Sequence, residues 1–280
     1  MSRRCSEPQQ TARPRSRRKK KSLAARGWLP NQHGAWAMLA VPFIVGVVLA
    51  SRAGKPLEAW LVPLAIAELS AYLAFNVLGL WLHAAPARRE AFRTPMIAYG
   101  ALTGLGAALV IVLGGASLLW WLPVAAPLMA WAVWQASRKH DRSVTSGLVT
   151  VALAVGMGLA IGFPDPRELM AGSSGSWAGL ATFGALFGYF GGTVWHVKSL
   201  IREWGNPRAR RQSIGWHVAF TALTTVATVA GLLNLGWPVF FAVCTLRSWW
   251  LPRLDHRPKP LRIGILEIAM SVAVLIVALA

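Results

Sequence analysis

Acidic residues and cysteines are scarce in this chain of 280 residues. It holds 10 Asp and Glu against 29 Lys and Arg, and two cysteines, Cys5 and Cys244. Charged residues make up 14% of the chain, whereas a soluble protein carries roughly 25%. The cysteines lie in a polar tail and an apolar segment, which is no pattern for a disulfide framework or a zinc site, so both are expected to be free thiols. The scarcity of charge excludes an ordinary soluble domain.

Apolar runs fill most of the chain, which is 55% hydrophobic. Helices satisfy their own backbone groups in lipid, and the period-two alternation of a membrane barrel is absent. We therefore expect an all-α, polytopic membrane helix bundle of about nine transmembrane helices. The expected spans are 34–52, 57–82, 95–115, 117–136, 143–163, 174–197, 213–235, 237–251 and 262–280.

Basic residues fall almost entirely on one side of these spans. Of the 29 Lys and Arg, only Arg52, Lys55 and Arg167 are left for the other side. The positive-inside rule then predicts a multi-pass plasma-membrane protein with a cytoplasmic N-terminus and an outside C-terminus. Residues 1–27 are expected to form a disordered basic cytoplasmic tail, and residues 28–280 the transmembrane domain. Because the charges lie in short loops between apolar spans, a nucleic-acid partner is not expected. The expected partner is the lipid bilayer.

Two carboxylates lie inside expected spans, Glu68 and Glu267. An ionised acid at mid-bilayer costs roughly 2.5–3.5 kcal/mol, so each is expected to face the bundle interior with a partner, or to be protonated. Glu267 lies close enough to the start of its span to reach Arg262 or another basic neighbour. Three histidines at the expected inner face, His33, His83 and His196, are further candidates, and His33 opens the first span in a polar cluster.

Two segments on the basic face, 76–95 and 189–206, are rich in polar side chains. One interpretation is a pair of solvated loops that set topology. The other is an anion site, because clustered Arg and Lys make charge-assisted contacts with phosphate or carboxylate. The residues predicted to bind the anion are Asn76, Arg88, Arg93, Lys198 and Arg202. Glu203 and Asn206 lie in the second segment and are candidates as well.

Three stretches carry a resemblance to a known family. The opening PNQHGAWAM, the segment VKSLIREWGN and the RIGILE near the C-terminus resemble the YwiC-like family of bacterial membrane proteins. The resemblance covers essentially the whole chain after the tail. It implies an integral membrane protein and names no reaction.

A second resemblance is to the UbiA superfamily of intramembrane prenyltransferases, which implies nine helices and a cytoplasmic-side site after spans two and six. Those enzymes hold Mg²⁺ on aspartate motifs, N-D-x-x-D and K-D-x-x-D-x-x-G-D. Here Asn76, Lys198 and Gly205 match the motifs. The motif aspartates are replaced by Val77, Leu80, Ser199, Arg202 and Asn206. Without that anionic shell Mg²⁺ is not expected, and no cofactor is predicted.

Three functions remain open from the sequence. The first is a UbiA-like binder or modifier of an isoprenoid or phospholipid phosphate, with a basic site that lacks metal. The second is a small-anion transporter, favoured by Glu68, Glu267 and the Gly- and Pro-interrupted spans. The third is an accessory membrane protein without chemistry of its own. Haem ligation by His33 with His83 or His217 also stays open, although no His-x-x-x-His pair occurs.

Overall fold

The computed structural model describes residues 27–30, 35–140, 143–254 and 256–280, and within these ranges it is helical with no strand. This confirms the all-α prediction. The helices are α1 (Ala35–Arg52), α2 (Leu61–His83), α3 (Pro86–Val112), the 3-10 helix η2 (Gly115–Trp121), α4 (Leu122–Ser137), α5 (Val144–Gly162), α6 (Arg167–Met170), α7 (Ser174–Ile201), α8 (Pro207–Val229), α9 (Gly236–Trp250), the 3-10 helix η3 (Leu251–Arg253) and α10 (Pro260–Leu279).

Each of the nine expected spans overlaps one long helix, but a count of nine membrane crossings is not confirmed. Within the described residues, five helical segments are long and apolar enough to cross a membrane. They are α2, α3, η2 with α4, α5, and α10. These segments support a multi-pass membrane protein. The predicted tail, apart from Gly27, lies outside the described residues, and so does His33.

Local signals explain where several helices begin. Pro86 and Pro207 occupy the first turns of α3 and α8, where a missing N–H costs nothing. The side chain of Asn206 caps α8 by accepting a hydrogen bond from the Arg208 amide at 3.0 Å. Both helices therefore begin earlier than the expected spans at 95 and 213. As a result Arg88 lies on a helix and not in a loop.

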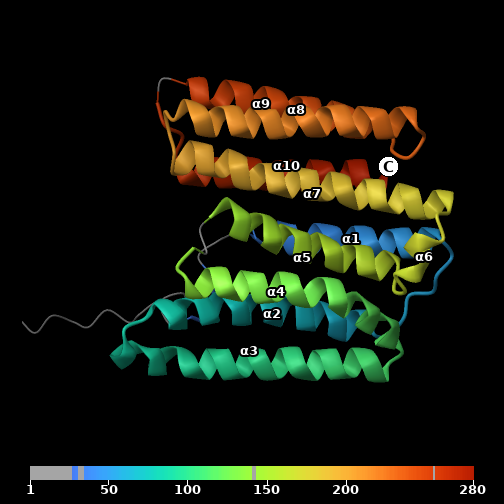
Figure 1. The fold of residues 1–280 in the computed structure, drawn as a ribbon, viewed down its shortest axis with the longest axis vertical. Helices are drawn as coiled ribbons and strands as arrows, with labels where there is room; N and C mark the ends of the chain where they lie inside the picture. The colour runs from blue at the N-terminus through green and yellow to red at the C-terminus, as the bar shows by residue number, and fades with distance from the viewer. Residues whose placement is uncertain (1–26, 31–34, 141–142, 255) are drawn as a thin grey trace, which may run out of the picture.

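The long helices stack in rows, as Figure 1 shows. α8 and α9 form one edge, followed by α7 with α10, then α1 with α5, then α4 with α2, and α3 forms the other edge. Four connections meet at the same end of the bundle: α2–α3, α4–α5, α7–α8 and α9–α10. We call this the basic end, because the expected inner-face loops with their Lys and Arg residues lie there.

The main core lies where α1, α5, α7, α9 and α10 meet. Val45, Val151, Leu186, Phe241 and Val274 are fully buried there. α3 and α4, by contrast, present many apolar side chains outward, as expected of helices in contact with lipid.

At the end opposite the basic end, the three basic side chains are engaged in contacts. Lys55 pairs with Glu168 at 2.5 Å and donates to the Gly162 carbonyl at 3.1 Å. Arg52 donates to the carbonyl of Leu279. Arg167 pairs with Asp165 at 2.5 Å, and its hydrogen bonds hold the pKa of that carboxyl below the usual value. These contacts tie the loops of this end together.

Candidate functional site

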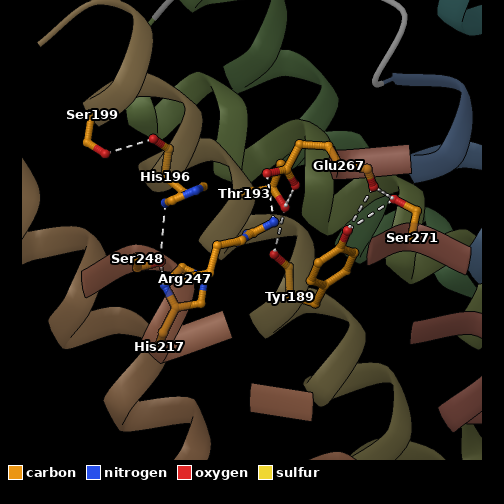
Figure 2. Close-up of polar contacts among 9 residues, drawn as sticks. All are labelled: Tyr189, Thr193, His196, Ser199, His217, Arg247, Ser248, Glu267 and Ser271. Atoms are coloured by element: carbon orange, nitrogen blue, oxygen red, sulfur yellow. Dashed lines mark hydrogen bonds and ion pairs between the residues drawn. The ribbon is translucent and has the colours of Figure 1, made fainter. Parts of the chain in front are cut away.

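A cluster of nine polar residues lies among α7, α8, α9 and α10 (Figure 2). We call it the buried polar cluster. Its members are Tyr189, Thr193, His196, Ser199, His217, Arg247, Ser248, Glu267 and Ser271. Helical spacing explains why they meet, because residues three or four apart share a face. Thr193 follows Tyr189 by one turn on α7, and Ser271 follows Glu267 by one turn on α10.

The centre of the cluster is an ion pair between α9 and α10. Nη1 of Arg247 donates to Oε1 of Glu267 at 2.8 Å, and the two side chains are only 6% and 8% exposed. The hydroxyl of Thr193 lies 3.2 Å from the other carboxylate oxygen, Oε2, and 3.2 Å from the carbonyl of Tyr189. Glu267 is therefore held by a cation on one oxygen and by a hydroxyl on the other.

Tyr189 and Ser271 fix the backbone next to this ion pair. The Tyr189 hydroxyl lies 3.1 Å from the Ser271 hydroxyl and 3.3 Å from the Glu267 carbonyl. Ser271 donates to the same carbonyl at 2.7 Å. Since hydrogen-bonded polar groups in a low-dielectric interior rigidify their surroundings, these contacts position Glu267 on α10 relative to α7.

Two buried histidines lie on the other side of Arg247 (Figure 2). Nδ1 of His217 lies 2.7 Å from the Ser213 carbonyl, which can only accept, so Nδ1 carries the proton. The Ser248 hydroxyl lies 3.1 Å from this Nδ1 and 3.2 Å from Nδ1 of His196. It can therefore accept from His217 and donate to Nδ1 of His196. Nε2 of both rings is buried without a partner among the described residues, so an imidazolium would leave a charged donor unpaired, which favours the neutral form of both rings.

Several polar atoms of the cluster have no hydrogen-bond partner within the described part of the chain. They are Nε2 of His196, Nε2 of His217, and Nε and Nη2 of Arg247. A buried donor without a partner costs about 1–3 kcal/mol, and more when it is charged. The ion pair alone therefore does not account for Arg247, because its Nε and Nη2 nitrogens are left without a partner among the described residues.

Glycines of α7 make room for the side chains of α8. A methyl group added at Gly192 would lie 2.6 Å from Nε2 of His217. One added at Gly188 would lie 2.1 Å from the ring of Phe220. The close approach of α7 and α8 therefore depends on these glycines, and it sets the position of His217.

The cluster lies in the half of the bundle nearest the basic end. Arg247 is in the last turn of α9. Glu267 is seven residues from the start of α10 at Pro260, which is about 10 Å at 1.5 Å per residue. The sequence left Arg262 or another basic neighbour as the partner of Glu267, and the partner in the structure is Arg247, which α9 brings against α10.

The residues predicted to bind an anion fall in two separate places. Asn76, Arg88 and Arg93 belong to α2 and α3, whereas Lys198 lies on α7 and Arg202 caps its C-terminal end. α2 packs mainly on α3, α7 packs mainly on α8 and α5, and the row of α1 and α5 lies between α2 and α7. A UbiA-like site would need spans two and six side by side, and these helices are not neighbours here.

The first of these groups lies at the surface. Arg88 and Arg93 are exposed, and Arg93 lies 3.6 Å from Glu90. Asn76 is half-buried in α2. His83 is exposed, and its Nε2 lies 3.0 Å from the Ala136 carbonyl. None of these side chains reaches the buried polar cluster.

The second group forms the connection between α7 and α8. Lys198 pairs with Glu203 at 2.8 Å, and Asn206 donates to Glu203 at 2.9 Å. Glu203 follows the end of α7 at Ile201, so it does not share a helical face with His196. The predicted candidates Glu203 and Asn206 thus contribute to the turn, while His196 points into the cluster.

The other intramembrane acid, Glu68, lies on α2, away from the cluster. Its side chain is half-buried, and Oε1 is buried without a partner among the described residues. The same part of the chain holds no group of three His, Cys, Asp or Glu side chains that could bind a metal ion. Cys244 is a buried free thiol, as expected.

Sequence reasoning missed Arg247 as a site residue. The available signal was an arginine inside one apolar span and a glutamate inside another. Buried charges of opposite sign in a membrane are expected to pair, so the two could have been matched. Ser248 gave no comparable signal, because hydroxyls are common in membrane helices, and His217 was named only as a possible haem ligand.

Comparisons with known proteins agree with the resemblance seen in the sequence. The family model described as YwiC-like protein matches residues 29–162. The chain is 31% identical over 242 residues to a Bacillus subtilis (strain 168) protein described as "Uncharacterized protein YwiC", and this alignment covers 86% of the chain and 92% of the relative. No solved structure matches. The length and identity of this alignment show that the chain belongs to the YwiC-like family.

Proposed function

We propose that this protein moves a small anion across the bacterial plasma membrane by way of the buried polar cluster. One observation carries the proposal. Arg247 is buried inside the bundle, pairs with Glu267 through Nη1, and leaves Nε and Nη2 without partners among the described residues. Ionisable residues inside a membrane bundle are costly and mark ligand and ion pathways. A buried cation with two unused donors supports an anion as the ligand.

The location of the cluster supports the same function. It lies within the helices, where a transported solute has to pass, and near the end that carries most of the positive charge. By the positive-inside rule we propose that this end and the N-terminus face the cytoplasm, and that Ala280 faces the outside. The basic loops would then raise the local concentration of anions close to the cluster.

An isoprenoid or phospholipid phosphate as the ligand has less support. Its predicted residues lie on two parts of the bundle, and Lys198 is already paired with Glu203. The exposed pair Arg88 and Arg93 remains suited to phosphate headgroups at the membrane surface. Such contacts would hold the protein against lipid without providing a transport site.

The test is anion flux in proteoliposomes made from the purified protein. We expect uptake of radiolabelled formate above that of protein-free vesicles, and loss of this uptake in Arg247→Gln. The matched control is Arg253→Gln. Arg253 is an exposed arginine just after α9, and its Cζ lies 3.9 Å from the centroid of the Trp249 ring. This control should retain flux. Absence of flux in the wild type for formate, acetate and chloride alike would overturn the proposed function.

A further inference from the structure

The free edge of Arg247 indicates which class of anion the site takes. Nε and Nη2 lie on the same edge of the planar guanidinium group, so their N–H bonds point in nearly the same direction. Both atoms are buried and without a partner in the described residues, whereas the third nitrogen, Nη1, is used by Glu267. Two parallel donors match the two oxygens of a carboxylate or another small oxyanion, but not a spherical halide.

Charge balance then decides what accompanies the anion. Arg247 and Glu267 neutralise each other, and the rings of His196 and His217 are fully buried with Nε2 unpartnered among the described residues, which favours their neutral form. A bound monoanion would give this buried site a net negative charge. An uncompensated charge is strongly unfavourable inside a protein in a membrane. Binding of the anion is therefore expected to require one proton.

Glu267 is the group best placed to take that proton. Its Oε1 lies 2.8 Å from Nη1 of Arg247, and the incoming anion would bind the same guanidinium group. The anion therefore weakens the contact that keeps the carboxylate ionised. Thr193 fits both states of Glu267. Its hydroxyl donates to Oε2 of the carboxylate, or else donates to the Tyr189 carbonyl while accepting a hydrogen bond from the protonated acid, and both distances are 3.2 Å.

The other ionisable groups near Glu267 are less well placed to accept the proton. α7 contributes Tyr189 and His196, α8 contributes His217, and α9 contributes Cys244 beside Arg247. From α1, which also packs on α10, the only ionisable side chain is Arg52 at the far end. His217 has a free lone pair on Nε2, but that atom lies against Gly192 of α7. Glu267 is the group that forms an ion pair with the guanidinium of Arg247, at 2.8 Å.

We propose that the buried polar cluster binds a small oxyanion on the Nε–Nη2 edge of Arg247 together with one proton, which Glu267 accepts. This deepens and rests on the proposed transport of a small anion. One carboxylate ligand and one proton enter, Glu267 becomes a neutral carboxylic acid, and no covalent bond is formed. Thr193 is a positioning residue that hydrogen-bonds Glu267 in either state.

The test uses the purified protein in detergent, without transport, with sodium formate as the probe. Calorimetric titration should show saturable binding, and a pH electrode in weakly buffered solution should show about one proton taken up per formate. By linkage, the affinity should fall about tenfold for each pH unit of increase, over the range in which the empty site is deprotonated. Sodium chloride at the same concentration should bind far more weakly.

Four variants at three positions separate the parts of the proposal. Glu267→Gln imitates the neutral acid, so it should bind formate with no proton uptake and with an affinity independent of pH. Arg247→Lys keeps the charge but loses the two-donor edge, so it should lose the preference for formate over chloride. Thr193→Ser should keep proton uptake, and Thr193→Val should reduce it. Monodisperse elution of each variant in size-exclusion chromatography shows that it is folded.

Other outcomes overturn the proposal in distinguishable ways. Formate binding without proton uptake, or proton uptake that survives in Glu267→Gln and disappears in His217→Gln, would reject the role of Glu267. Equal binding of chloride and formate would reject the oxyanion edge. In either case proteoliposome flux can still support anion transport. If neither anion binds and no flux is seen, the proposed function fails as well.

Discussion

Arg247 and Glu267 lie 20 residues apart in the chain and form an ion pair of 2.8 Å between α9 and α10, away from solvent. Each charge therefore depends on the other. Breaking a buried pair by removal of one partner costs about 3–5 kcal/mol, because the remaining charge has no counterpart, whereas replacing both by apolar residues is often neutral. This relationship gives the first prediction.

We expect Arg247→Met and Glu267→Leu each to lower the free energy of unfolding by about 3–5 kcal/mol, and the double variant to lower it by much less than the sum. Equilibrium unfolding in mixed detergent micelles, followed by circular dichroism, measures all three. Additive effects in the double variant would mean that the two side chains do not depend on each other.

Gly192 is predicted to set the position of His217. In Gly192→Ala the new methyl group would lie 2.6 Å from Nε2 of His217, so α7 and α8 would have to separate or the ring would have to turn. Overpacking of this kind costs about 1–3 kcal/mol. The control is Gly184→Ala on the same helix, where a methyl group meets nothing within 4 Å. Thermal unfolding should show a lower midpoint for Gly192→Ala only, and equal midpoints would contradict the close contact.

Gly158 is predicted to be essential for the packing of α5 on α1. A methyl group at this position would lie 2.3 Å from the Pro42 carbonyl oxygen, which is backbone and cannot turn aside. We expect Gly158→Ala to destabilise the protein more strongly than Gly192→Ala. Gly156→Ala is the matched control, because it faces open space on the same helix. Comparable stability of Gly158→Ala and Gly156→Ala would show that the two helices do not approach so closely.

Glu68 is predicted not to take part in transport. Its Oε1 is buried without a partner among the described residues, and an ionised acid in the membrane interior costs roughly 2.5–3.5 kcal/mol. Without a partner the acid is expected to be protonated, and Glu68→Gln imitates this neutral form, so it should leave both the unfolding midpoint and formate flux in proteoliposomes nearly unchanged. If flux falls while the variant remains folded, the pathway extends to α2.

The orientation of the bundle gives a further prediction. The background is a Cys5→Ser variant that keeps the buried Cys244. One cysteine is then added at a time, either at His140, an exposed position at the basic end, or at Ser174, an exposed position at the other end. A membrane-impermeant maleimide added to intact cells should label Ser174→Cys only, and the same reagent added to inverted vesicles should label His140→Cys only. The reverse pattern would place the N-terminus outside.

The fold class could be predicted from the sequence because lipid imposes a simple rule. Long apolar runs without alternation have to form helices, and each expected span coincides with one helix. Helix ends were less predictable. α3 begins at Pro86 and α8 at Pro207, since a proline in the first turn and the cap by Asn206 extend both helices beyond their apolar cores. The basic residues near these ends, Arg88 among them, consequently lie on helices.

The candidate site was predicted only in part. Glu267 and His196 were named from the sequence and both lie in the buried polar cluster, whereas Lys198 and Glu203 pair with each other in the turn after α7. The predicted role of the surface arginines as the lining of one site stays untested, and their helices are not neighbours. Sequence spacing places side chains on one helix, but it does not say which helices touch.

The sequence by itself determined that this is a helical membrane protein with its positive charge at one end, because hydrophobicity and charge act along the chain. Only the tertiary structure decided which residues meet. Arg247, Glu267, His196 and His217 come from four helices, and their contacts depend on close helix packing at glycines such as Gly192. A buried charge has to find its partner across space, and the partner is set by the packing of the bundle, not by the order of the residues.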